Sequence, residues 1–130
     1  MHVASGAAAG AAAGSRTRAL LLGPLLHLAG DLIPHHDIPS RRFEIGSGIA
    51  AGLALVAWRG PFDPATIGGI SAAAPDLEHV LALPRPGGRK LFPSHRFHGW
   101  HREGGVPAWT QLLVAAVLLA AVLSHAPKTR

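Results

Sequence analysis

The sequence predicts an all-α protein: one domain of residues 1–130, built as a multi-pass membrane bundle of four or five short helices with a histidine and aspartate site at one end. Two observations predict the membrane class. Only 15% of the residues are charged, whereas ordinary soluble domains carry about 25%, and apolar segments alternate with short polar loops. A third observation predicts the site, because most of the nine histidines lie near the ends of the apolar segments.

The first two predicted helices are rich in small or apolar residues. Residues 3–14 are almost entirely Ala and Gly, and the glycines recur every fourth residue, which lets neighbouring helices approach closely. We therefore expect a close-packed helix here, with a flexible tail as the alternative because glycine has a poor helix propensity. A second helix is expected over about 17–33, kinked near Pro24 and ended by Pro34.

Three further helices are predicted. An apolar stretch rich in Gly and Ala indicates the third over 43–58. Asp63 and Pro64 then form a helix start signal, since an acid caps the first turn and proline fits its first position. This fourth helix is expected to reach about residue 83 with an interruption at Pro75. The fifth, over 107–123, has about 17 residues, the lower limit for crossing a bilayer core, and a basic tail follows it.

Composition limits the chemistry. The chain has no cysteine, which excludes disulfides, thiolate zinc sites and cysteine-ligated iron–sulfur clusters. A bound metal must therefore be held by histidine and carboxylate. The net charge is +5, but the basic residues lie in short loops and not along one helix face, so nucleic acid is not the expected partner. Membrane lipid and an anionic or phosphate-containing substrate are expected instead.

The first half of a metal site is predicted around the end of the second helix. His27 and Asp31 are four residues apart, so their side chains share one helix face. His35 and His36 follow the proline that ends the helix and can fold back over that face. Neutral imidazole and ionised carboxylate suit zinc, with manganese or iron as alternatives. A buried hydrogen-bonded His27–Asp31 pair is the non-metal alternative, and Asp37 is interpreted either as a ligand or as a turn cap.

The second half is predicted after Pro75. Asp76 and His79 are three residues apart, a spacing that suits one metal, although Asp76 can instead cap a helix beside a surface histidine. Glu78 points away from Asp76 on a helix, so it is interpreted as a base, as a partner of a ligand, or as a ligand itself. Histidines then recur at every third position of the following loop, at His95, His98 and His101. That loop can also be read as a titratable segment at a membrane interface.

A topology test favours one shared site. If all five segments cross the membrane, every histidine except His125 falls on one side or at the adjoining helix ends, as do the four acidic candidates. Ionisable residues at membrane depth indicate function by default.

The sequence resembles the membrane-bound metal-dependent hydrolase family, also described as LexA-binding, inner-membrane-associated hydrolases. The matching residues are Met1-His2 before the Ala/Gly run, the Pro-Asp-Leu-Glu-His segment at 75–79, and the histidine-rich loop at 95–101. Glu78 stands where the family has a second aspartate. The resemblance implies a hydrolase of the bacterial inner membrane with His2 near the metal. The His27–Asp31 pair is also similar to zinc-dependent phospholipases C and nucleases, and His36-Asp37 to HD-type phosphohydrolases.

The combined hypothesis is metal-assisted hydrolysis, in which the metal makes hydroxide available near neutral pH. The predicted base is Glu78, Asp37 or a free histidine. The predicted metal-site residues are His2, His27, Asp31, His35, His36, Asp76, His79, His95 and His98. The predicted substrate-binding residues are Arg41, Arg42, Arg96, His101 and Arg102. The alternatives are a non-catalytic metal or haem protein, a pH-responsive membrane module, and a soluble five-helix packing.

Overall fold

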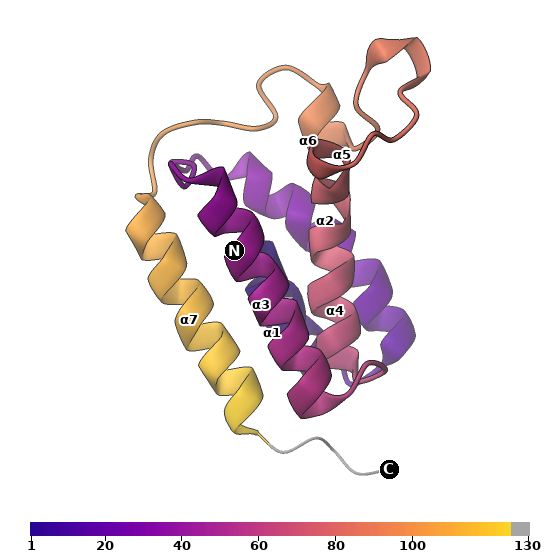
Figure 1. The fold of residues 1–130 in the computed structure, drawn as a ribbon, viewed down its shortest axis with the longest axis vertical. Helices are drawn as coiled ribbons and strands as arrows, with labels where there is room; N and C mark the ends of the chain where they lie inside the picture. Colours follow the sequence, from indigo (N-terminus) through magenta and orange to yellow (C-terminus); the bar gives the residue numbers. More distant parts are fainter. Residues whose placement is uncertain (126–130) are drawn as a thin grey trace.

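The computed structural model describes residues 1–125 and shows an all-α chain (Figure 1). Five longer helices form a bundle, and shorter helical turns lie at one end of it. The elements are α1 (His2–Ala13), α2 (Arg16–Leu32), α3 (Arg41–Arg59), α4 (Pro64–Ala73), the 3-10 turn η1 (Ala74–Asp76), α5 (Leu77–Val80), the 3-10 turn η2 (Pro86–Gly88), α6 (Pro93–Arg96) and α7 (Ala108–Ser124). Most of the predicted basic tail lies outside the described residues.

The Ala/Gly helix α1 is the centre of the bundle. It packs against α4, α2 and α7, while α3 packs on α4. The fully buried core is made of small side chains and a few larger ones, as in the cluster of Ala7, Leu55, Ala65 and Val122. Small side chains let the helix axes approach closely, so short helices can share a core that contains few large residues.

Glycines set the contact between α1 and α4. A Cβ atom added to Gly6 would collide with the backbone carbonyl of Gly68, and one added to Gly68 would collide with the carbonyl of Gly6. Gly10 has the same relation to the carbonyl of Pro64. The close-packed helix predicted from the glycine spacing is therefore confirmed, and the flexible-tail alternative is wrong.

The ends of two helices follow the predicted signals. Asp63 accepts a hydrogen bond from the Ala65 amide (2.8 Å), as expected for the residue before a helix. Pro75 interrupts the α-helical pattern, and the chain continues as η1 and then α5. This break matters for the site because Asp76, Glu78 and His79 follow it directly. In contrast, α2 runs through Pro24 without interruption.

The prediction of a multi-pass membrane bundle, and with it the membrane localisation, is wrong. Among residues 1–125 no helix has both the length and the apolar character needed to cross a bilayer. A hydrocarbon core needs about 20 apolar residues, whereas α4 has 10 residues and α7 has 17. The longest helix, α3, has 19 residues but includes four charged ones.

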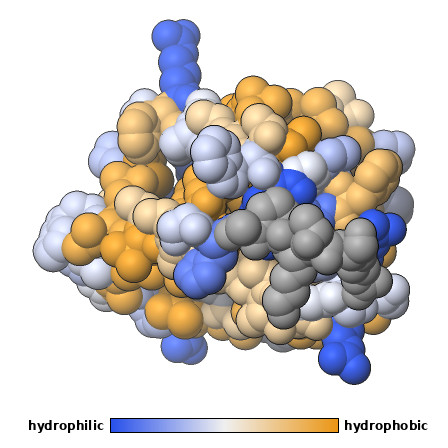
Figure 2. Space-filling model, turned by 90° about the horizontal axis from the view of Figure 1, so that it is seen from below, coloured by the Kyte–Doolittle hydropathy of each residue, from blue (hydrophilic) through white to orange (hydrophobic). Residues whose placement is uncertain are grey.

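Arg59 connects several segments at the end of the bundle opposite the short turns. Its guanidinium pairs with Asp63 (3.0 Å) and donates to the carbonyls of Val122 (3.1 Å) and His125 (2.7 Å). A groove beside this pair is lined by α1, the turn before α4, and α7. Figure 2 looks at this end and shows apolar areas interrupted by polar and charged residues. None of the predicted metal-site residues lines the groove.

The glycine contact yields a stability prediction. Replacement of Gly68 by Ala should lower the free energy of unfolding by at least about 1–3 kcal/mol, because overpacking forces the two backbones apart. Gly46 on α3 has no atom near the position of an added Cβ, so Gly46→Ala should raise stability by about 0.5–1 kcal/mol through helix propensity. Urea denaturation followed by circular dichroism measures both changes. Equal effects of the two substitutions would contradict the packing described here.

Candidate metal centre

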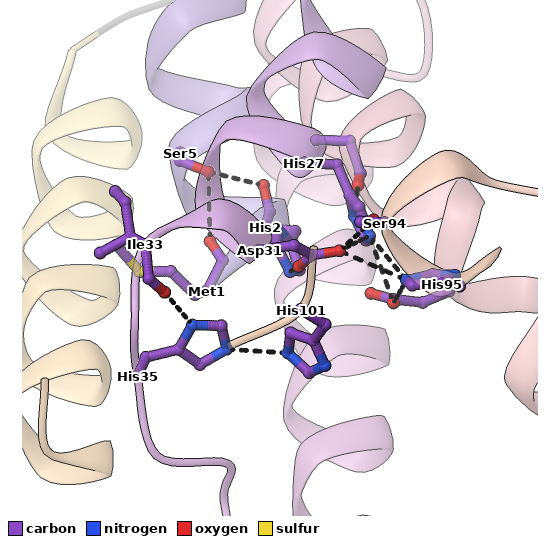
Figure 3. Close-up of polar contacts among 12 residues, drawn as sticks. Met1, His2, Ser5, His27, Asp31, Ile33, His35, Ser94, His95 and His101 are labelled. Atoms are coloured by element: carbon purple, nitrogen blue, oxygen red, sulfur yellow. Dashed lines mark hydrogen bonds and ion pairs between the residues drawn. The ribbon is translucent and has the colours of Figure 1, made fainter. Parts of the chain in front are cut away.

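Four segments bring their polar side chains together at one end of the bundle. His2 comes from the start of α1, His27 and Asp31 from the last turns of α2, and the adjacent Ser94 and His95 from α6 (Figure 3). Asp76, at the end of η1, lies beside the same histidines. The sequence distance between α2 and α6 is large, so this arrangement depends on the tertiary fold and not on a local motif.

Asp31 is the central anion of the cluster. Its side chain is buried, with Oδ2 accepting a hydrogen bond from the Ser94 hydroxyl (2.6 Å) and Oδ1 lying 3.3 Å from Nε2 of His2. Burial alone would raise the pKa of Asp31, but contacts with three histidines and Ser94 outweigh burial and hold that pKa well below its usual range. The cluster therefore contains a fixed negative charge.

His27 presents a free nitrogen to this charge. Its Nδ1 lies 2.7 Å from the carbonyl oxygen of Ala72, and because a carbonyl only accepts, Nδ1 carries the proton. In the neutral ring the lone pair is then on Nε2, which faces Asp31 Oδ2 at 3.2 Å. A ligating histidine in a metal site commonly donates its other N–H to a carbonyl or carboxylate in this way.

His95 is also oriented by a hydrogen bond from its second ring nitrogen. Its Nδ1 lies 2.6 Å from Oε1 of Glu78. Burial would raise the pKa of Glu78, but hydrogen bonds from the Leu91 and Phe92 amides and from His95 lower it, so the carboxylate is ionised and accepts. Nε2 of His95 consequently points at Asp31. Burial would lower the pKa of His95, yet the carboxylates of Asp31, Glu78 and Asp76 raise it, which means that Nε2 attracts a positive charge.

The three inward-facing atoms form a nearly equilateral triangle. His27 Nε2 and Asp31 Oδ2 are 3.2 Å apart, the two Nε2 atoms of His27 and His95 are 3.3 Å apart, and His95 Nε2 lies 3.4 Å from Asp31 Oδ2. Tetrahedral zinc with bonds of about 2.0–2.1 Å requires ligand separations of roughly 3.3–3.4 Å. These buried groups can therefore hold a metal ion without rearrangement.

Asp76 borders the triangle on a more exposed side. Its Oδ1 lies 3.6 Å from His27 Nε2 and 3.8 Å from His95 Nε2, and its side chain is 47% exposed. Asp76 also forms potential metal-binding groups with His2 and His27 and with His79 and His95. These groups overlap, because they share His27, His95 and Asp76, so they lie at one place in the fold.

His2 supports Asp31 from the other side. Its ring stacks on that of His27, with 3.8 Å between the centroids. Burial lowers the pKa of His2 despite its contact with Asp31, so the ring is neutral and donates from Nε2 to Asp31 Oδ1. The motifs that carried the family resemblance, Met1-His2 and the segment 75–79, thus meet at one place.

Basic side chains surround α5. Lys90 Nζ lies 3.0 Å from Nδ1 of His79, and Arg85 donates to the carbonyl of Glu78 (2.9 Å). Arg41, predicted to bind substrate, donates to the carbonyl of His79. Burial together with the nearby His95 and Lys90 lowers the pKa of His79. Three basic side chains therefore lie around α5, the helix that follows Asp76.

The remaining predicted residues lie elsewhere. His35, Asp37 and His101 form a second group, separate from Asp31 (Figure 3). His36 and His98 belong to no metal-binding group within residues 1–125. The predicted substrate-binding residues Arg42, Arg96 and Arg102 are exposed.

Sequence reasoning missed one member of the centre, Ser94. Its hydroxyl is buried and donates to Asp31, so it fixes the ligand oxygen. No sequence signal marks it, because a serine beside a histidine in a loop is common and only the fold brings it to α2.

Comparison of the chain with known protein families, with curated proteins and with solved structures finds no match. The family resemblance stays a prediction, and the chemistry of the site must be inferred from its residues and their geometry.

Glu78 provides a pH-dependent test of the centre. In metal-free protein, Glu78→Gln should lower the free energy of unfolding at pH 7 by about 1–3 kcal/mol, because an amide cannot accept from all three donors. The pKa of Glu78 is lower in the folded than in the unfolded chain. The carboxylate therefore stabilises the fold above about pH 4.3, and this contribution is lost as the pH falls through the folded value.

The difference between wild type and Glu78→Gln should accordingly shrink between pH 7 and pH 3.5 in urea denaturation. The exposed Glu103 supplies a control, since Glu103→Gln should leave stability nearly unchanged at both pH values. A Glu78→Gln variant that is as stable as the wild type at pH 7 would contradict the role given to this carboxylate.

Proposed function

We propose that the chain is a metal-dependent hydrolase whose ion is bound by His27, Asp31 and His95. The observation that carries the proposal is the triangle of donor atoms, with separations of 3.2, 3.3 and 3.4 Å. Both histidines have the second nitrogen engaged by an acceptor, so the free nitrogens are already aimed at the ion position. Without a proton or a cation between them, two lone pairs and a carboxylate would repel one another at these distances.

Zinc suits this donor set best. Two imidazole nitrogens and one carboxylate oxygen are typical zinc ligands, and three protein ligands with one open position are typical of catalytic zinc. Manganese and iron accept the same donors but usually take more ligands. Supported ligands also favour one defined geometry. Ser94 and His2 hold Asp31, Glu78 holds His95, and the Ala72 carbonyl holds His27.

A water molecule bound to the ion would lie on the more exposed side of the triangle, which Asp76 borders. A bound divalent ion lowers the pKa of its water to near neutrality and polarises a carbonyl or phosphoryl oxygen. Asp76 is half-exposed and lies beside both histidine nitrogens, so we assign it the role of accepting the proton of that water. Of the bases predicted from sequence, Glu78 is occupied with His95 and two amides, and Asp37 belongs to the other group.

The charge around α5 supports an anionic substrate. Arg41, Arg85 and Lys90 all contact Glu78 or His79 next to Asp76. Basic side chains at this position can neutralise the oxygens of a phosphate ester as it approaches the ion. The net charge of +5 adds long-range attraction for such a substrate. A phosphate ester is therefore the proposed substrate class. The proposed reaction, hydrolysis, is also the one that the family resemblance implies.

Metal binding is the first test. Wild-type protein should retain one tightly bound zinc per chain in competition with a chromophoric chelator, and the double substitution His27→Gln/His95→Gln should abolish that tight site. The exposed His98 provides the control, because His98→Gln removes a histidine but no ligand. Wild-type affinity that is unchanged in the double variant would refute this ligand assignment.

Catalysis is the second test. Zinc-loaded protein should hydrolyse bis(p-nitrophenyl) phosphate, and Asp76→Asn should lower kcat by about 10²–10⁴-fold, as expected for loss of a general base. The tight zinc should remain bound in Asp76→Asn. Glu103→Gln removes an exposed carboxylate that belongs to neither group and should leave kcat unchanged. A wild-type protein with bound zinc but without hydrolysis of phosphate esters would indicate a non-catalytic metal site.

A further inference from the structure

We propose a second divalent-metal site, separate from the first, formed by His35, Asp37 and His101. The two Nε2 atoms of His35 and His101 lie 3.2 Å apart. Oδ1 of Asp37 lies 3.6 Å from the His35 nitrogen and 3.7 Å from the His101 nitrogen. These separations are close to the roughly 3.3–3.5 Å between ligands of a tetrahedral ion.

The first histidine of this group is oriented as a ligand. Nδ1 of His35 lies 2.7 Å from the carbonyl oxygen of Ile33, which only accepts, so this nitrogen carries the proton. In the neutral ring the lone pair is then on Nε2, which faces the His101 ring, as Figure 3 shows. The pattern repeats the one found at His27, on a different pair of segments.

Backbone hydrogen bonds place the two histidines side by side before any ion binds. The His35 amide donates to the carbonyl of Arg102 (3.1 Å), and the Gly104 amide donates to the carbonyl of His35 (3.0 Å). The Val106 amide donates in turn to the carbonyl of Pro34 (3.0 Å). Residues 34–37 and 101–106 thus form a paired loop element, and an ion shared by His35 and His101 would cross-link its two segments.

This site differs from the first in its contact with solvent. The side chains of Asp37 and His101 are 64% and 42% exposed, while that of His35 is 13% exposed. Two of the three ligands must therefore lose side-chain freedom on binding, and water can complete the coordination. We expect weaker binding here than at the buried triangle, with zinc or another imidazole-binding divalent ion as the ligand.

The site is also connected to the first centre through the backbone. The Arg102 amide donates to the carbonyl of Asp31 (3.4 Å), so the loop that carries His101 is attached to the last turn of α2. An ion at the second site would hold residues 101–106 against the end of the helix that supplies His27 and Asp31. Its effect is structural: it orders the paired loop next to the buried centre.

Zinc titration by calorimetry tests the proposal. Wild-type protein should bind two zinc ions per chain, one tight and one weaker, and His101→Ala should lower the affinity of the weaker one by more than about tenfold while the tight one remains. Retention of the tight ion shows that the variant is folded. Asp37→Asn, at an exposed position, should also lower the affinity for the weaker ion. The control is His36→Ala, which removes an exposed histidine and should leave both affinities unchanged.

Hydrogen exchange supplies an independent readout. Occupancy of the second site should slow exchange of the His35 and Gly104 amides in the wild type but not in His101→Ala. Two zinc ions with unchanged affinities in His101→Ala would overturn the proposal, as would a wild type whose only zinc is lost in His27→Gln/His95→Gln. A wild type whose only zinc is lost in His101→Ala would instead support the second site and refute the first.

Discussion

The buried charge of Asp31 is the constraint on which this structure depends. An ionised carboxylate without partners in a protein interior costs several kcal/mol. Here the Ser94 hydroxyl from α6 and the His2 imidazole from α1 donate to it, and the Nε2 atoms of His27 and His95 face it. Ser94 and His95 come from α6 and His2 comes from α1, so the requirement of one carboxylate on α2 fixes the relative positions of three helices. The same requirement brings together the nitrogens that can hold a cation.

The small-residue core makes this convergence possible. Because α1 and α4 touch through glycine backbone, the ends of short helices lie close enough for side chains to meet across them. The 3-10 turn that contains Pro75 follows α4, and its last residue, Asp76, lies at the edge of the histidine cluster. The small residues of the core thus determine both the close packing of the helices and the meeting of polar side chains at the end of the bundle.

Local signals predicted what depends on local geometry. The four-residue spacing of His27 and Asp31, the glycine period of α1 and the break at Pro75 all reappear in the structure. The path of the loops was not predictable, and it decides that Ser94 reaches Asp31 and that His35 and His101 form their own group. The membrane prediction failed because a low charged fraction was interpreted as long apolar spans, whereas it reflects alanine and glycine used for close packing in short helices.

The glycine contact also limits how this protein can change over evolution. At Gly6, Gly10, Gly23 and Gly68 even a methyl group would meet another backbone or side chain, so almost every substitution there is penalised. In the segments 81–92 and 97–106 the restricted positions are instead the glycines with positive φ and the proposed ligand His101. Sequence variation that alters substrate preference or ion preference is therefore expected at the other positions of these loops, while the glycines between the helices stay invariant.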